Sequence, residues 1–137
     1  IDSLISQTYK NIEIIVIDDN ADENLKTENE KYFENLRDER IIYIQNSKNI
    51  GSAKSRNKGL NIAKGEYVTF LDDDDYYSPD KIEIQLNETI KNGYKVSICN
   101  FIIINFKFCC VRMLWTYQID SADVIYCNLM LSIVKMV

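Results

Sequence analysis

The sequence predicts an α/β fold in three layers, with helices on both faces of a mostly parallel sheet. Short runs of β-branched and aliphatic residues alternate with longer, charged segments in which apolar residues recur at helical spacing. Residues 12–17 are apolar apart from Glu13, which is typical of a parallel strand buried on both faces. The segments between such runs are long enough to hold a helix, and helical connections favour parallel neighbouring strands.

The composition is that of a globular protein with a single core. The chain has 137 residues, of which 46% are hydrophobic and 27% are charged, as in ordinary domains. Its net charge of −5 argues against nucleic acid as a partner. The sequence contains no histidine, which excludes His-dependent triads and leaves acid–base chemistry to carboxylates, Lys, Tyr or Cys.

The predicted elements follow one another along the first 104 residues. We expect strands at residues 12–17, 41–45, 67–71 and 95–104, with helices at residues 1–8, 23–36, 52–64 and 79–92. Gly65 and Gly93 are predicted to end the two helices that precede them. Ser78 and Pro79 are predicted to be the N-cap and the first position of the last helix.

Acidic residues follow two of the predicted strands. Asp18 and Asp19 come after the first strand, and four consecutive aspartates, Asp72–Asp75, come after the third. The carboxyl ends of parallel strands form the edge of a sheet where ligands bind. Adjacent carboxylates repel one another, and oxygen-rich acidic sites suit Mg²⁺ or Mn²⁺. The four aspartates therefore predict a cation site, with a solvated acidic turn as the alternative.

Two further features of this pattern bear on the ligand. Alternate residues of an extended segment point the same way, so Asp72 and Asp74 are expected to share one ligand while Asp73 faces elsewhere. Arg56 lies near the middle of the predicted helix 52–64. A guanidinium can hold phosphate oxygens with two parallel hydrogen bonds, although an exposed surface arginine is the other interpretation.

The composition changes in the last third of the chain. Charged residues become sparse in residues 105–137, which contain neither Gly nor Pro, and no turn or cap can be assigned there. Polar residues interrupt the apolar runs, which favours a core helix or strand over a membrane span. The four cysteines, Cys99, Cys109, Cys110 and Cys127, show no paired spacing typical of a zinc site. We interpret them as reduced thiols and expect a cytoplasmic protein.

Four motifs occur in a characteristic order. They are the segment 6–19 ending in Asp18-Asp19, then Asn49-Ile50-Gly51 with Ser55-Arg56-Asn57-Lys58-Gly59, then residues 63–75 ending in four aspartates, and then Pro79-Asp80-Lys81. In this order and spacing, residues 1–104 resemble the nucleotide-sugar-binding half of a family 2 glycosyltransferase with the GT-A fold. The resemblance implies a metal-dependent, inverting enzyme that transfers a sugar from a nucleotide-diphosphate sugar to an acceptor hydroxyl in polysaccharide or glycan synthesis.

The resemblance also implies roles for individual residues. It places Asp18, Asp19, Arg56, Asp72 and Asp73 around the nucleotide sugar, with Asp19 against the base or ribose. Asp72 and Asp74 match the Asp-x-Asp motif that holds Mn²⁺ or Mg²⁺ on the diphosphate. A glycan or lipid-linked acceptor, and a place at the inner face of the membrane for the full-length parent protein, are implied in the same way.

The chain also departs from the family pattern. The strand with which family members begin is not recognisable, and no carboxylate base can be assigned after Ile104, where Asp120 and Asp123 are the only acids. We therefore expect residues 1–104 to be a partial donor-binding domain and residues 105–137 to be an unassigned apolar tail, either a truncated or a frame-shifted remainder. The chain by itself is then expected to be inactive. A non-catalytic nucleotide- and metal-binding module, or a non-functional remnant, is the alternative.

Overall fold

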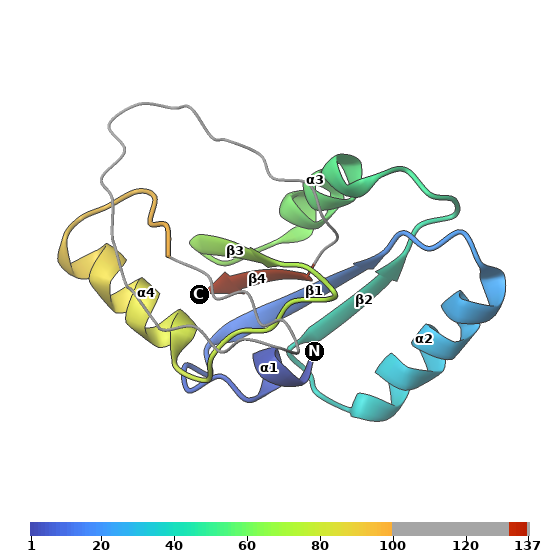
Figure 1. Ribbon diagram of the computed structural model, residues 1–137, viewed down its shortest axis with the longest axis horizontal. Coiled ribbons are helices and arrows are strands. Elements are labelled where there is room, and N and C mark those ends of the chain that lie inside the picture. Colours follow the sequence, from blue (N-terminus) through green and yellow to red (C-terminus); the bar gives the residue numbers. More distant parts are fainter. Residues whose placement is uncertain (100–131, 137) are drawn as a thin grey trace, which may run out of the picture.

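The computed structural model describes residues 1–99 and 132–136 of the protein. Figure 1 shows helices on both sides of one sheet. The elements in chain order are α1 (Asp2–Ile5), β1 (Ile12–Asp18), α2 (Glu23–Leu36), β2 (Ile41–Gln45), α3 (Ser52–Ile62), β3 (Tyr67–Leu71), α4 (Lys81–Lys91) and β4 (Ser132–Met136). No helix within the described residues is long and apolar enough to cross a membrane.

The sheet has the strand order β2-β1-β4-β3. β1 and β2 are parallel, and Asp18 at the end of β1 lies opposite Gln45 at the end of β2. β4 is antiparallel to both of its neighbours, β1 and β3. β1, β2 and β3 therefore run in one direction, and their carboxyl ends lie at one edge of the sheet.

The core lies on both faces of β1, because every second residue of a strand points to the same face. On one face, Ile14 packs in a cluster with Leu4 of α1 and Ile82 of α4. On the other face, Ile15 and Ile17 pack with partly buried residues that include Ala63, just after α3. These two clusters confirm the predicted three-layer α/β/α arrangement.

The start of α4 differs from the prediction and is capped from a distance. The helix begins at Lys81, after Asp80 as N-cap, so Ser78 and Pro79 lie in the preceding turn. The buried Gln7 accepts a hydrogen bond from the Ile82 amide at 3.0 Å and donates one to the Ser78 carbonyl at 2.7 Å. A side chain 75 residues away thus satisfies an amide that a local cap would otherwise take.

Three further predictions have different outcomes. Gly93 follows α4 at a φ of +67°, as expected for a residue that ends a helix. Gly65 does not play this part, since α3 already ends at Ile62 and is followed by Ala63 in extended conformation. Residues 95–99 form no strand, and the rest of the predicted strand 95–104 lies outside the described residues. β4 lies in the tail that was left unassigned.

Candidate active site

The end of β1 holds a carboxylate that is bonded within the protein. Asp18 is buried and accepts hydrogen bonds from the Asn29 amide group at 2.9 Å, from the Tyr43 hydroxyl and from the backbone amide of Asn20 at 2.9 Å. Burial by itself would raise the pKa of Asp18, but these hydrogen bonds, with the nearby Lys26, lower it overall. Asp18 thus ties β1 to β2 and α2, and its carboxylate is ionised at neutral pH.

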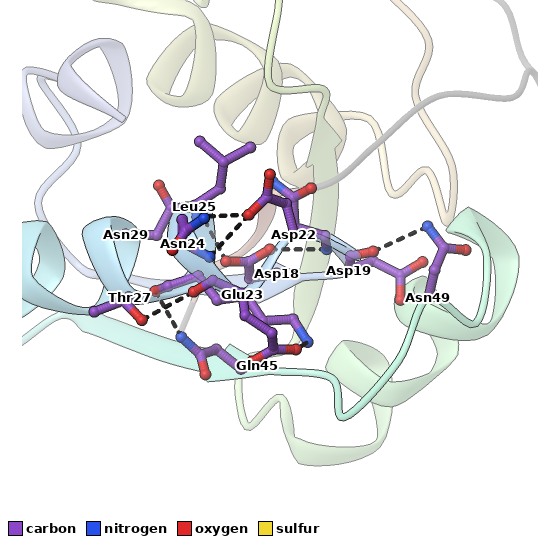
Figure 2. Close-up of polar contacts among 12 residues, drawn as sticks. Asp18, Asp19, Asp22, Glu23, Asn24, Leu25, Thr27, Asn29, Gln45 and Asn49 are labelled. Carbon is purple, nitrogen blue, oxygen red and sulfur yellow. Dashed lines mark hydrogen bonds and ion pairs between the residues drawn. The ribbon is translucent and has the colours of Figure 1, made fainter.

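Asp19 is bonded even more completely, to the loop between β2 and α3. Its carboxylate accepts hydrogen bonds from the amides of Ile50 at 2.8 Å and Gly51 at 2.7 Å, and from the Asn46 side chain at 2.8 Å. Its carbonyl accepts from the Asn49 side chain at 2.9 Å, a contact visible in Figure 2. The segment from Asn46 to Gly51 is therefore fastened to the end of β1.

Asn46 was missed in the sequence, although a signal for it existed. It directly follows β2, and the ends of parallel neighbours lie side by side, so a polar residue there is placed close to the end of β1; the contact with Asp19 itself depends on how β2 and α3 pack beside β1. Its side chain also donates to Ser55 of α3 at 3.0 Å and accepts from Lys58 at 2.6 Å. This buried amide thus joins three elements at the ligand-binding edge of the sheet.

Arg56 and Asp72 form an ion pair between α3 and the end of β3. Arg56 Nη2 lies 2.9 Å from Asp72 Oδ1, and the two side chains are only 13% and 21% exposed. The guanidinium also lies over the Phe70 ring, 5.9 Å from its centroid. The structure thus brings together two of the residues predicted for the nucleotide-sugar site.

The turn that follows Asp72 is open to solvent. Asp73, Asp74 and Asp75 are exposed, and the Asp75 amide donates to the Asp72 carbonyl at 3.2 Å. Burial raises the pKa of Asp72, Arg56 opposes the shift, and the charges of Asp75, Asp74 and Asp73 add to it. Negative charge is therefore concentrated here beside a single guanidinium, which makes the turn receptive to a cation.

A set of partly buried and exposed hydrogen bonds, here called the relay, joins the segment after this turn to β3. The Lys81 ammonium donates to the Thr69 hydroxyl at 3.0 Å, and Thr69 and Tyr77 share a hydrogen bond of 2.7 Å. Since the Tyr77 hydroxyl donates its proton to the Phe70 carbonyl, Thr69 must be the donor to Tyr77. Lys81 also lies 3.7 Å from the centroid of the Tyr77 ring. These contacts hold the segment after the turn, with Tyr77 and Lys81, against β3.

The relay was not found in the sequence. Burial lowers the pKa of Lys81 to about 8, against an opposing influence of Cys99. Burial also raises the pKa of Tyr77. Nothing in the local pattern distinguishes Tyr77 from the adjacent Tyr76, which is 62% exposed. The two tyrosines differ only in the folded protein, where Tyr77 packs against β3 and Tyr76 does not.

The comparison with protein families shows which family the chain belongs to. Residues 1–108 match the family described as Glycosyl transferase family 2. The chain belongs to this family. The match spans both acidic strand ends and α3, so it includes Arg56 and Asp72.

Individual relatives are named as glycosyltransferases. A UDP-Glc:alpha-D-GlcNAc-diphosphoundecaprenol beta-1,3-glucosyltransferase of Escherichia coli, WfaP, is 44% identical over 87 residues, covering 64% of this chain and 33% of the relative. Glycosyltransferase GlyA of Streptococcus pneumoniae is 38% identical over 105 residues, covering 77% of this chain and 15% of the relative. A second E. coli glucosyltransferase, WfgD, is 36% identical over 105 residues, with shares of 77% and 40%. The chain thus spans a minor part of these relatives.

Members of the family generally use a divalent metal ion, and the acidic turn fits one only in part. Within the described ranges, no three acidic or cysteine side chains lie close enough to hold a metal by themselves. One oxygen of Asp72 is already engaged by Arg56. The donor set suits a hard cation that takes most of its ligands from phosphate and water, as Mg²⁺ does.

Proposed function

We propose that this chain is the donor-binding part of a glycosyltransferase that moves a sugar from a nucleotide-diphosphate sugar to an acceptor hydroxyl in polysaccharide or glycan synthesis. The observation that carries the proposal is the Arg56–Asp72 pair, 2.9 Å apart, at the end of β3 beside the exposed Asp73 and Asp74. The partly buried Arg56 guanidinium fixes the Asp72 carboxylate, while Asp73 and Asp74 stay open to solvent. This arrangement suits a diphosphate bound through a divalent ion.

The residues around the turn would have separate roles in binding the donor. Arg56 bonds one oxygen of Asp72, which leaves the other oxygen for the ribose or the donor sugar, with Asp73 as the next residue along the turn. Asp74 supplies the carboxylate for Mn²⁺ or Mg²⁺, helped by Asp72. When bound, the ion offsets the negative charge that grows on the diphosphate leaving group. Asp18 and Asp19, which the resemblance places near the nucleotide, lie at the same edge of the sheet and accept hydrogen bonds from the protein.

The names of the relatives point to an acceptor class. Two of them are named for transfer from UDP-Glc to a GlcNAc-diphosphoundecaprenol, which is a lipid-linked sugar. We therefore extend the proposal to a lipid-linked acceptor and to a parent protein at the inner face of the membrane. The general base is not assigned, because Asp120 and Asp123 lie outside the described residues.

Calorimetry tests the donor proposal with the 137-residue chain. We expect UDP to bind in the presence of Mn²⁺ and to bind much more weakly when the metal is chelated. Asp74→Asn should weaken the metal-dependent binding about 10- to 100-fold, the order of effect that loss of a metal-site group produces. Asp75→Asn is the matched control from the same turn and should bind much as the wild type does. Equal binding by the Asp74→Asn variant would overturn the metal assignment.

A further inference from the structure

Helix α3 carries two cations that reach the carboxyl ends of different strands. Arg56 meets Asp72 after β3 at 2.9 Å. Two residues further along the helix, the half-buried Lys58 ammonium donates to the Asn46 side-chain oxygen at 2.6 Å and lies 3.4 Å from the Gln45 carbonyl at the end of β2. The proposed function uses Arg56 but gives Lys58 no role.

The Asn46 amide joins Lys58 to Asp19. Asn46 is 4% exposed, and its Nδ2 atom donates to Asp19 Oδ1 at 2.8 Å and to Ser55 Oγ at 3.0 Å. Its backbone amide also donates to the Asp18 carbonyl at 2.8 Å. One buried amide group therefore has a cation on its oxygen and an anion on its nitrogen.

Only one orientation of this amide suits both charges. An ammonium group donates and does not accept, whereas an ionised carboxylate accepts and does not donate. If the amide turned over, its NH₂ group would face the Lys58 ammonium and its oxygen would face the Asp19 carboxylate, so both hydrogen bonds would be lost in a buried place. Hydrogen bonds in such a chain also polarise and strengthen one another. Lys58 therefore favours the orientation in which Asn46 donates to Asp19.

We propose that Lys58 is a positioning residue for donor binding, which fixes the Asn46 amide and through it holds the Asp19 carboxylate in place. The resemblance places Asp19 against the base or ribose of the nucleotide, so the effect of Lys58 on donor affinity rests on the proposed function. The effect of Lys58 on Asp19 is a property of the ligand-free protein. The two effects can be measured separately.

The ionisation of Asp19 supports this assignment. Burial by itself would raise the pKa of Asp19, but its hydrogen bonds, with those from the Ile50 amide and the Asn46 side chain foremost, lower the pKa overall. Without the Lys58 ammonium, the Asn46 amide is less polarised and can turn away from Asp19. The pKa of Asp19 should then rise.

The first experiment is a nuclear magnetic resonance titration of the Asp19 carboxyl group in the ligand-free 137-residue chain. Lys58→Met should raise the pKa of Asp19 above that of the wild type, and Lys58→Arg, which keeps a cationic donor, should restore most of the difference. Lys54→Met is the matched control, because it removes the same charge from an exposed position of the same helix; it should leave the pKa unchanged. An unchanged pKa in Lys58→Met would overturn the inference.

The second experiment measures donor binding by calorimetry. With Mn²⁺ present, Lys58→Met should weaken the binding of UDP about 10-fold, at the lower end of what loss of a group that orients a binding residue costs. Lys58→Arg should recover most of the affinity, and Lys54→Met should bind as the wild type does. Wild-type affinity in Lys58→Met would overturn the role in donor binding.

A double-mutant cycle shows whether Lys58 acts through Asn46. In an Asn46→Ala background, Lys58→Met should weaken UDP binding little further, because no amide remains to be oriented. Additive losses would show that Lys58 acts without Asn46 and would overturn the inference. If Asn46→Ala does not fold, the Asp19 titration in Lys58→Met decides alone. If the wild type binds no UDP, the proposed function fails, whereas the titration still decides whether Lys58 positions Asp19.

Discussion

The two acidic strand ends of this protein have the same residue type at the same edge of one sheet, yet their environments are opposite. Asp18 and Asp19, after β1, are buried and accept hydrogen bonds from several side chains and backbone amides. In the turn after β3, Asp73 and Asp74 are exposed, and Asp72 has one guanidinium as its partner. Acidic residues at a strand end thus identify the edge, whereas the donors around each carboxylate decide whether it is structural or open to a ligand.

The pKa values express this difference with opposite signs. Hydrogen bonds lower the pKa of Asp19 below 3.8 despite its burial, whereas burial and neighbouring charges raise the pKa of Asp72 above 3.8 despite Arg56. A lowered pKa means that the ionised carboxylate stabilises the fold at neutral pH. A raised pKa means that ionisation costs folding free energy there. The turn after β3, residues 72–75, is here called the open end. Ionised Asp72 lowers the stability of the fold there, and a bound cation can offset this cost.

The largest expected effect comes from replacing Arg56, the side chain that pairs with Asp72 in the turn after β3. Arg56→Met should lower the free energy of unfolding by about 2–3 kcal/mol, below the 3–5 kcal/mol of fully buried pairs because both side chains are partly exposed. It should also weaken metal-dependent UDP binding, since Asp72 loses its orientation. Urea unfolding and calorimetry measure the two effects.

The Arg56→Met result has two informative companions. Arg56→Lys keeps the charge but loses the planar fork and should lie between the variant and the wild type. The double variant Arg56→Met with Asp72→Asn should be more stable than Arg56→Met alone, because no uncompensated charge remains. Additive effects of the two substitutions would contradict a direct pair.

The end of β1, with Asp18 and Asp19, is here called the bonded end. Loss of the Tyr43 hydroxyl should lower the stability of the fold there. Tyr43→Phe removes a hydrogen bond to the Asp18 carboxylate and should cost about 1.5–3 kcal/mol of unfolding free energy, as hydrogen bonds to charged groups do. The stacking of ring 43 on Phe33, with centroids 4.4 Å apart, should persist. Urea unfolding measures the loss, and near-ultraviolet circular dichroism checks the ring environment. A loss as small as that of Tyr32→Phe, an exposed tyrosine of α2, would contradict this role.

The comparison also shows what the sequence could predict. Strand ends follow from local patterns, so β1, β2, β3 and the edge that gathers Asp19, Arg56 and Asp72 were predictable. The donors to Asp19 were not, because Asn46 and Ser55 meet it only after β2 and α3 pack beside β1. The antiparallel β4 was not predicted either, since it lies in a tail without turn residues or caps.

The start of α4 shows why a local rule can fail. Ser78 and Pro79 fit the statistics of a helix start, but the amide of Ile82 is satisfied by Gln7 from another part of the chain. Once a buried glutamine caps the helix, the local serine is not required, and its carbonyl accepts from Gln7 instead. Tertiary contacts thus overrode a correct but weak local preference.

The pH dependence of stability tests the opposite pKa shifts of Asp19 and Asp72 directly, and the expected differences in stability are smaller. At pH 7, Asp19→Asn should be less stable than the wild type, and the difference should shrink as the pH falls below 3.8 through the lower folded pKa of Asp19. The ionisation cost at Asp72 is present at neutral pH and disappears as the pH falls through its raised folded pKa. Asp72→Asn removes this cost together with the Arg56 contact, so it should destabilise the protein less than Asp19→Asn. Thermal unfolding from pH 3 to pH 7 makes the measurement, and equal losses for the two variants at pH 7 would contradict the comparison.

The smallest expected effect concerns the support beneath the open end. Tyr77→Phe removes the hydroxyl that joins Thr69 to the Phe70 carbonyl, while the ring beneath the Lys81 ammonium remains. The loss should be about 0.5–1.5 kcal/mol, the usual net value of a neutral hydrogen bond.

The effect of Tyr77→Phe should be local, because the lost hydroxyl bonds only to Thr69 and Phe70 of β3, next to the acidic turn. We expect faster hydrogen exchange in residues 72–77 and weaker metal-dependent UDP binding, without faster exchange in residues 46–56. Tyr76→Phe is the matched control: this neighbouring tyrosine is 62% exposed, so its hydroxyl should be dispensable in both measurements. If the two variants behave alike, the turn is held by its own backbone, and the open end needs no support from Tyr77. If only Tyr77→Phe loosens the turn, the exposed carboxylates of the turn depend on the hydrogen bonds of Tyr77, much as Asp18 and Asp19 depend on their donors.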